Sequence, residues 1–280
     1  MAAVTKAAAP QGLGPLARPR NSILVGLLVL SAIGWVLVVW QAGSDTSMSM
    51  RGGTGGGMGS GMETGLDLTM GMAAPLFLAM WVAMMVAMMF PAAAPMVLLF
   101  DRVERGKREA GRSFVPTAYF VGAYLAIWTA FGVLAFALAV VVDRLVTNAG
   151  WDTGQWARFG GILLIAAGLY QLTPLKEVCL SKCQSPMSFL MTSWRNGKVG
   201  AIQMGLLHGG YCLGCCWLLF VILLPLGVMN VAAMVVIALL VFGEKTLPVG
   251  SRIARAAALV LVVYGVVVTL SPGALPTTVG

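Results

Sequence analysis

Charged residues are scarce in this chain. Of its 280 residues, 10% are Asp, Glu, Lys or Arg and 59% are hydrophobic, and the mean hydropathy is +0.90. A soluble globular protein carries about 25% charged residues, so this composition excludes that class and indicates a protein that crosses the membrane several times. In a membrane protein, a formal net charge of +8 mainly reflects basic residues at the cytoplasmic ends of the spans. No nucleic-acid partner is therefore expected.

Nucleotide-binding and hydrolytic signatures are also missing. The sequence contains no Walker loop, no dinucleotide-binding glycine fingerprint, no HExxH and no nucleophile elbow. This absence excludes ATP-driven transport within the chain, and we expect the protein not to be an enzyme.

Histidine and cysteine are few and unevenly placed. The chain has one histidine and five cysteines, and all the cysteines follow residue 178. An odd number of cysteines, none of them in the long polar segment of residues 42–73, argues against an extracellular disulfide framework. We therefore expect thiols that are free or bound to a metal.

Long apolar runs predict an all-α, polytopic transmembrane helical bundle of about seven spans, with the N-terminus inside and the C-terminus outside. The first run has about 19 residues, longer than the roughly 7–15 of a signal-peptide core, so we interpret it as an anchor. The expected spans cover residues 22–40, 74–100, 115–142, 157–174, 199–229, 231–242 and 253–270.

The same pattern divides the chain into five segments. Fifteen basic residues flank the expected inner ends of the spans, against Arg51, Arg144 and Arg158 at the outer ends, as positive-inside topology requires. The segments are a disordered cytoplasmic tail (1–21), a first transmembrane anchor (22–41), a Gly/Met-rich extracytoplasmic loop (42–73), a six-span metal-binding membrane domain (74–270) and a short outer tail (271–280).

One stretch in the fifth expected span concentrates soft donor atoms. Residues 208–216 read HGGYCLGCC. On a helix, His208, Cys212 and Cys215 fall within roughly 60° of one another, with Cys216 beside them. Thiolate and imidazole donors favour soft ions, so these four residues are predicted to bind Cu(I) or, as a second choice, Zn(II). Ordinary packing of cysteines beside helix-contact glycines is the alternative.

Two methionine stripes occupy the second expected span. Thioether sulfur is a soft donor that suits Cu(I), so the first stripe is predicted to join the metal site, with core packing as the alternative. Pro91 and Pro95 should bend this helix and leave room for a cavity beside the methionines. The first stripe is Met80, Met84 and Met88, and the neighbouring one is Met85, Met89 and Met96.

The extracytoplasmic loop is also rich in methionine. Six methionines between residues 48 and 72 are spread through Gly and Ser, without histidine or cysteine. Such a segment either captures Cu(I) weakly or is a low-complexity linker.

Two further cysteines, Cys179 and Cys183, are spaced at i and i+4 on the expected inner side. Lys176 and Lys182 lie beside them and favour thiolate, and a helical pair of this spacing could hold Cu(I) linearly. Ordinary juxtamembrane thiols, or palmitoylation sites, are the alternatives.

The dipeptide Glu244-Lys245 closes the sixth expected span. We interpret it as an interfacial ion pair whose lysine extends toward the lipid head groups. A proton relay or weak metal ligation by Glu244 remains open.

Several of these motifs together resemble the bacterial family of predicted metal-binding integral membrane proteins, which carries a copper chaperone-like label. The resemblance covers about residues 74–250 and implies the fold and a location in the bacterial inner (cytoplasmic) membrane. Gln184 departs from it, because arginine is expected after the second cysteine. The motifs are residues 80–91, 168–176 with Cys179 and Cys183, 208–217, Met229-Asn230 and Glu244-Lys245.

These features predict a multi-pass membrane protein that binds a soft metal ion, Cu(I) before Zn(II), for delivery or transport across the inner membrane. The expected partners are the lipid bilayer, the metal ion, and a metallochaperone or a cuproenzyme. Two other functions stay open. One is a membrane thiol-disulfide oxidoreductase, with Cys179 and Cys183 as its redox pair, and the other is a non-catalytic assembly subunit for a metalloenzyme.

Overall fold

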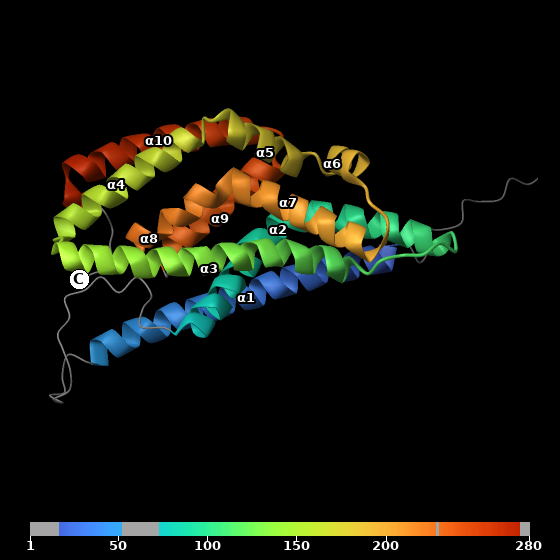
Figure 1. Ribbon diagram of the computed structural model, residues 1–280, viewed down its shortest axis with the longest axis horizontal. Helices are drawn as coiled ribbons and strands as arrows, with labels where there is room; N and C mark the ends of the chain where they lie inside the picture. The colour runs from blue at the N-terminus through green and yellow to red at the C-terminus, as the bar shows by residue number, and fades with distance from the viewer. Residues whose placement is uncertain (1–16, 52–72, 228–229, 275–280) are drawn as a thin grey trace, which may run out of the picture.

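The computed structural model describes residues 17–51, 73–227 and 230–274, with side chains described from residue 22 and not for residues 44–51. Every regular element in these ranges is helical (Figure 1), which confirms the all-α class. The elements are α1 (Ala17–Arg51), α2 (Ala74–Glu109), α3 (Thr117–Ala149), α4 (Thr153–Tyr170), α5 (Pro174–Gln184), α6 (Pro186–Ser193), α7 (Gly197–Val221), α8 (Leu223–Leu226), α9 (Val231–Thr246), α10 (Gly250–Leu270) and the 3-10 turn η2 (Pro272–Ala274).

Five stretches of the described chain are long and apolar enough to cross a membrane: α1, α2, α3, α7 with α8, and α10. A sixth is obtained if α4 and α5, which meet at a 64° bend, form one broken span. The expected number of seven is not confirmed, because α9 has 16 residues. At about 1.5 Å per residue it covers about 24 Å, less than the hydrocarbon core of about 30 Å.

The first span extends beyond its expected limits. Helix α1 begins at Ala17 and continues to Arg51, into both the predicted tail and the predicted loop. Residues 1–16, 52–72 and 275–280 lie outside the described part of the chain, and with them most of the tail, of the methionine-rich loop and of the outer tail.

Helix α2 continues nine residues past residue 100, where the second span was expected to end. Ion pairs one turn apart stabilise this charged extension. Arg105 Nε lies 2.5 Å from Asp101 Oδ2, and Lys107 Nζ lies 2.8 Å from Glu104 Oε1. The charged run is therefore a helical end of the span and not a separate loop.

Small residues allow the long helices to approach closely. At the contact of α7 with α3, a Cβ on Gly205 would overlap the carbonyl oxygen of Phe120. At the contact of α4 with α10, a Cβ on Gly161 would lie 2.8 Å from the carbonyl oxygen of Gly265. These contacts hold α7 against α3 and α4 against α10.

Two breaks bring short helices back toward α7. Thr173 caps α5 by accepting a hydrogen bond from the Lys176 amide at 3.3 Å, directly after the bend that ends α4. Gly227, with φ of +91°, ends α8, and the Asn230 side chain caps α9 by accepting from the Ala233 amide at 3.0 Å. Because of these breaks, α5 and α9 both contact α7.

Candidate metal centre

The central part of α7 carries the four predicted donor residues, and all four are buried. His208 and Cys212 line the same cavity. The Cys215 and Cys216 thiols instead donate hydrogen bonds to the carbonyl oxygen of Cys212, at 3.1 Å and 2.9 Å. Cys212 thus lines the cavity, and the Cys215 and Cys216 thiols lie against its backbone, outside the cavity wall.

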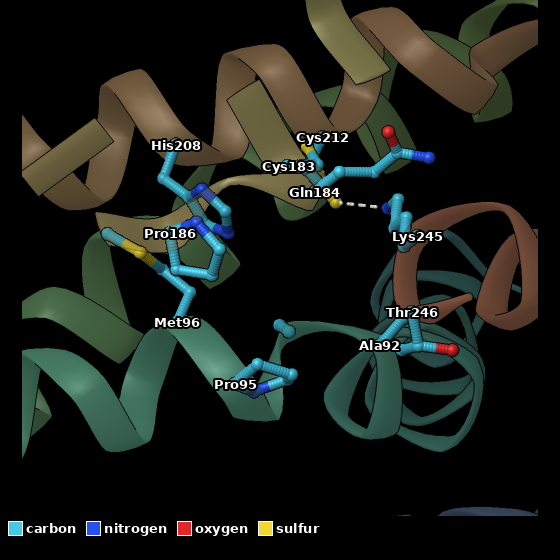
Figure 2. Close-up of a pocket in the computed structure, with 11 residues that line it drawn as sticks. Ala92, Pro95, Met96, Cys183, Gln184, Pro186, His208, Cys212, Lys245 and Thr246 are labelled. Carbon is cyan, nitrogen blue, oxygen red and sulfur yellow. Dashed lines mark hydrogen bonds between the residues drawn. The ribbon is translucent and has the colours of Figure 1, made fainter. Parts of the chain in front are cut away.

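The cavity has a volume of about 120 Å³, well above the roughly 10–15 Å³ that one water molecule needs. It lies between α2, α5, α6, α7 and α9, and Figure 2 shows side chains from these helices pointing into it. Its lining residues with polar or sulfur atoms are Met96, Cys183, Gln184, His208, Cys212, Lys245 and Thr246.

The proline-containing segment of α2 forms one wall of this cavity. Pro91 and Pro95 lie inside the helix, which changes direction along its length in Figure 1. Ala92, Ala93, Pro95 and Met96 line the cavity. A cavity beside the methionines was predicted, and Met96 is the methionine that lines this one, next to Pro95.

Cys183 from α5 joins the thiols of α7. Its side chain lines the same cavity as Cys212 and lies beside it in Figure 2, and the Cys215 and Cys216 thiols bond to the carbonyl oxygen of Cys212. Four thiols from two helices therefore form one closed group, which we call the thiol cluster (Cys183, Cys212, Cys215 and Cys216). The sequence spacing could not show that α5 contributes to it, because the contact depends on the bend after α4.

Lys245 supplies the one amine that contacts the thiol cluster among the described residues. Its side chain is 7% exposed, and its Nζ donates to Cys212 Sγ at 2.9 Å and lies 3.9 Å from Met89 Sδ. The interpretation of Lys245 as a lysine extending to the lipid head groups is wrong. A lysine inside an apolar span is a functional candidate by default, and that signal could have identified it.

Glu244 does not pair with its neighbour Lys245. Its Oε2 accepts a hydrogen bond from Lys176 Nζ at 2.7 Å, and both side chains are 1% exposed. Successive residues on a helix point about 100° apart, so Glu244 and Lys245 take partners on different helices. Lys176 was expected to act on the neighbouring thiols and is instead bound to this carboxylate.

His208 lies in an aromatic cage. Its ring stacks on Phe120 and Tyr124 at centroid distances of 5.9 Å and 5.8 Å and meets Phe189 edge-on at 5.5 Å. Within the part of the chain that the structure describes, its buried Nδ1 has no hydrogen-bond partner. An unpaired buried nitrogen on a cavity wall is suited to a ligand, because leaving it unsatisfied is costly.

Tyr124 also touches the cluster. Its hydroxyl lies 3.1 Å from Cys212 Sγ. Cys212 therefore has polar neighbours from α3 and α9 as well as the thiol of Cys183 from α5.

Six predicted site residues lie outside the cavity wall, namely Cys215 and Cys216, described above, and Cys179, Met80, Met84 and Met88. Cys179 is on α5, but its sulfur packs against Gly214 of α7 and does not line the cavity. A Cβ atom added to Gly214 would lie 2.8 Å from this sulfur. Met80, Met84 and Met88 are absent from the lining as well. The neighbouring stripe approaches the site instead, with Met96 in the wall and Met89 near Lys245.

The donor set suits a soft cation, since it combines thiols, a thioether and an imidazole. Across the described ranges, no group of three or more His, Cys, Asp or Glu side chains is placed so that it could hold a metal ion as it stands. Cu(I) does not require such a group, because it accepts linear coordination by a pair of sulfurs. Cys183 and Cys212 are a pair of this kind, on facing helices.

The chain matches a known protein family. A family model described as "PpoB2: Copper chaperone" matches residues 78–268, which include α3 to α9 and most of α2 and α10. This match confirms the resemblance stated from the motifs. No curated protein and no solved structure matches the chain.

Proposed function

Because the chain belongs to the PpoB2 copper chaperone family, we propose that it is a membrane-embedded chaperone that binds Cu(I) between Cys183 and Cys212 and passes the ion on. The family description is that of a chaperone and not of an enzyme. Several helices are long and apolar enough to cross a membrane, which supports a membrane location, and we propose the bacterial inner membrane.

The observation that carries this proposal is the meeting of Cys183 and Cys212 at one cavity wall. The two thiols come from α5 and α7 and line the same cavity. Met96 and His208 offer a thioether and an imidazole in the same cavity. Binding by sulfur atoms on separate helices allows release when the helices move apart, as transfer requires.

The position of the cavity suggests the side of delivery. Gln184 is the last residue of α5 and Thr246 the last of α9, and both line the cavity. The cavity thus lies where two helices end, on the side that the flanking basic residues assign to the cytoplasm. We propose transfer to or from a soluble partner on that side, a metallochaperone or a cuproenzyme.

The direct test is Cu(I) retention by the purified protein. The detergent-solubilised chain is loaded with Cu(I) without oxygen, passed over a desalting column and analysed for copper per protein. Wild type should retain a stoichiometric amount, and Cys183→Ser and Cys212→Ser should lose it. Cys179→Ser is the matched control, since it removes a thiol from the same helix outside the cavity. Equal retention by Cys212→Ser and wild type would overturn the proposal.

A thiol oxidoreductase is the second candidate, and the same contact between Cys183 and Cys212 favours it. The predicted redox pair, Cys179 and Cys183, is replaced by a pair across two helices. The two thiols would lose two protons and two electrons to a quinone or a disulfide and form one disulfide. Mass spectrometry of alkylated protein distinguishes the functions: a reversible Cys183–Cys212 disulfide in protein that retains no copper supports the oxidoreductase.

A further inference from the structure

Helix α6 lies at the edge of the bundle (Figure 1) and presents two methionines outward. Met187 and Met191 are 58% and 79% exposed, and Met191 is the most exposed large apolar side chain that the structure describes. The other methionines with described side chains are buried or half-buried. Met187 and Met191 are therefore not needed to fill the core, and their thioethers are accessible.

The opposite face of α6 is fixed to the candidate metal centre. Phe189 is buried, and its ring meets His208 edge-on at 5.5 Å. Pro186, the first residue of α6, lines the cavity together with Met96 and His208 (Figure 2). Met187 directly follows Pro186, so the exposed thioethers begin one residue from the cavity wall.

The surroundings of α6 are those of a membrane–water boundary and not of the hydrocarbon core. Lys182 precedes the helix, and the exposed Arg195 and Lys198 follow it. Ser188 and Thr192 are exposed next to the two methionines. A face in contact with lipid tails alone would not carry these polar groups. Ions dissolved in water can therefore reach the two sulfurs.

The spacing of Met187 and Met191 suits a single soft ion. Residues at i and i+4 on a helix have Cβ atoms about 5–6 Å apart on the same face. Metal–sulfur bonds of roughly 2.3 Å place two sulfurs on opposite sides of an ion about 4.6 Å apart, which flexible methionine side chains at this spacing can reach. Thioethers are soft and neutral, so they bind Cu(I) and Ag(I), and they bind these ions more weakly than thiolates do.

We propose that Met187 and Met191 form a second soft-metal site beside the cavity, which takes up Cu(I) and passes it to Cys183 and Cys212. This inference rests on the proposed function and adds an entry step to it. On entry, the bonds from Cu(I) to the two thioether sulfurs break, bonds to the Cys183 and Cys212 sulfurs form, and each thiol proton that is displaced leaves to solvent. The copper stays Cu(I), so no oxidant or reductant takes part.

The binding test follows isotope-labelled methionine methyl groups of the detergent-purified, full-length protein by NMR while Ag(I), a redox-stable analogue of Cu(I), is added. Met187→Leu and Met191→Leu assign the two resonances, and both variants should fold because both positions are exposed. In wild type both resonances should shift, and each should stay in place when the other methionine is leucine. Met204, which is 1% exposed, is the internal control and should not respond. Two unmoved resonances, or shifts that persist in the single variants, would overturn the inference.

The transfer test measures the rate at which the copper-free protein takes Cu(I) from a coloured chelator complex without oxygen. The double variant Met187→Leu, Met191→Leu should reach the same final copper content as wild type. Its uptake should be slower by about 10-fold, which corresponds to a barrier raised by about 1.4 kcal/mol. Ser188→Ala is the matched control, because it changes the exposed side of α6 without removing a sulfur. Equal uptake rates in the double variant and wild type would overturn the entry step.

Failure of this inference is distinguishable from failure of the proposed function. Copper retention that does not depend on Cys212 would overturn the proposed function. The methionine resonances report on Met187 and Met191 whether or not Cys183 and Cys212 hold the ion.

Discussion

Lys245 Nζ donates a hydrogen bond to Cys212 Sγ at 2.9 Å and so joins α9 to the centre of α7. The contact exists because the chain breaks at Gly227 and returns as a short helix whose last turn reaches the cavity. This contact accounts for one of the buried charged residues in α9, a helix of 16 residues. The C-terminal turn of α9 lines the cavity with Lys245 and Thr246 and does not extend to the lipid head groups.

The two methionine stripes should differ in their effect on copper binding. Met96 lines the cavity, whereas Met84 is buried outside its wall. Leucine replaces methionine at nearly constant volume, usually at a cost below about 1.5 kcal/mol, so both variants should fold. Met96→Leu should weaken Cu(I) binding in a competition with a chromophoric chelator, and Met84→Leu should not. The reverse result would assign the site to the stripe of Met80, Met84 and Met88.

Substitution of His208 should separate ligation from packing. His208→Phe keeps a ring of similar size in the cage of Phe120, Tyr124 and Phe189 and removes the unpaired Nδ1. If the imidazole binds copper, the variant should keep its melting temperature and lose Cu(I) affinity. Thermal unfolding and chelator competition on the same sample measure both. Unchanged affinity would support the packing alternative.

The buried pair of Lys176 and Glu244 should show strong coupling. Removal of one partner leaves an unpaired buried charge, which costs about 3–5 kcal/mol. Lys176→Met and Glu244→Gln should therefore each lower the melting temperature strongly. The double variant leaves no unpaired charge and should be more stable than either single variant. A double variant destabilised by the sum of both effects would contradict the pairing.

The contact of α3 with α7 should depend on Gly205. A methyl group there would overlap the carbonyl oxygen of Phe120, whereas Gly210 in the same helix has open space around its Cβ position. Gly205→Ala should cost about 1–3 kcal/mol through forced separation of the helices. Gly210→Ala should be neutral or stabilise by up to about 1 kcal/mol. Thermal unfolding of the two variants compares them directly, and equal melting temperatures would refute the close contact.

Hydropathy was sufficient to predict the helical class and the approximate position of the long apolar helices, but it left out α5 and α6, which lie between two expected spans. The end of α2 was misjudged because the helix continues past its apolar part into a charged turn, which the ion pair of Arg105 with Asp101 stabilises. The predicted number of about seven spans is not confirmed, because α9 is apolar enough to suggest a span but has only 16 residues.

The site was predictable in part. Helical spacing placed His208 and Cys212 on one face, and both line the cavity. Periodicity does not show which face of a helix meets a neighbour, so it could not choose between the methionine stripes. The approach of Cys183 and the inward direction of Lys245 depend on breaks at residues 171–173 and 227–230, whose geometry is set by tertiary contacts.

The central claim is that Cu(I) is held by sulfur atoms at the Cys183–Cys212 contact. X-ray absorption spectroscopy of the Cu(I)-loaded, detergent-purified protein tests it most directly, because sulfur and lighter scatterers are distinguished in the first coordination shell. We predict a shell dominated by sulfur that is lost or replaced in Cys212→Ser and unchanged in Cys179→Ser. A first shell of nitrogen or oxygen alone, or a sulfur shell that survives Cys212→Ser unaltered, would contradict the account.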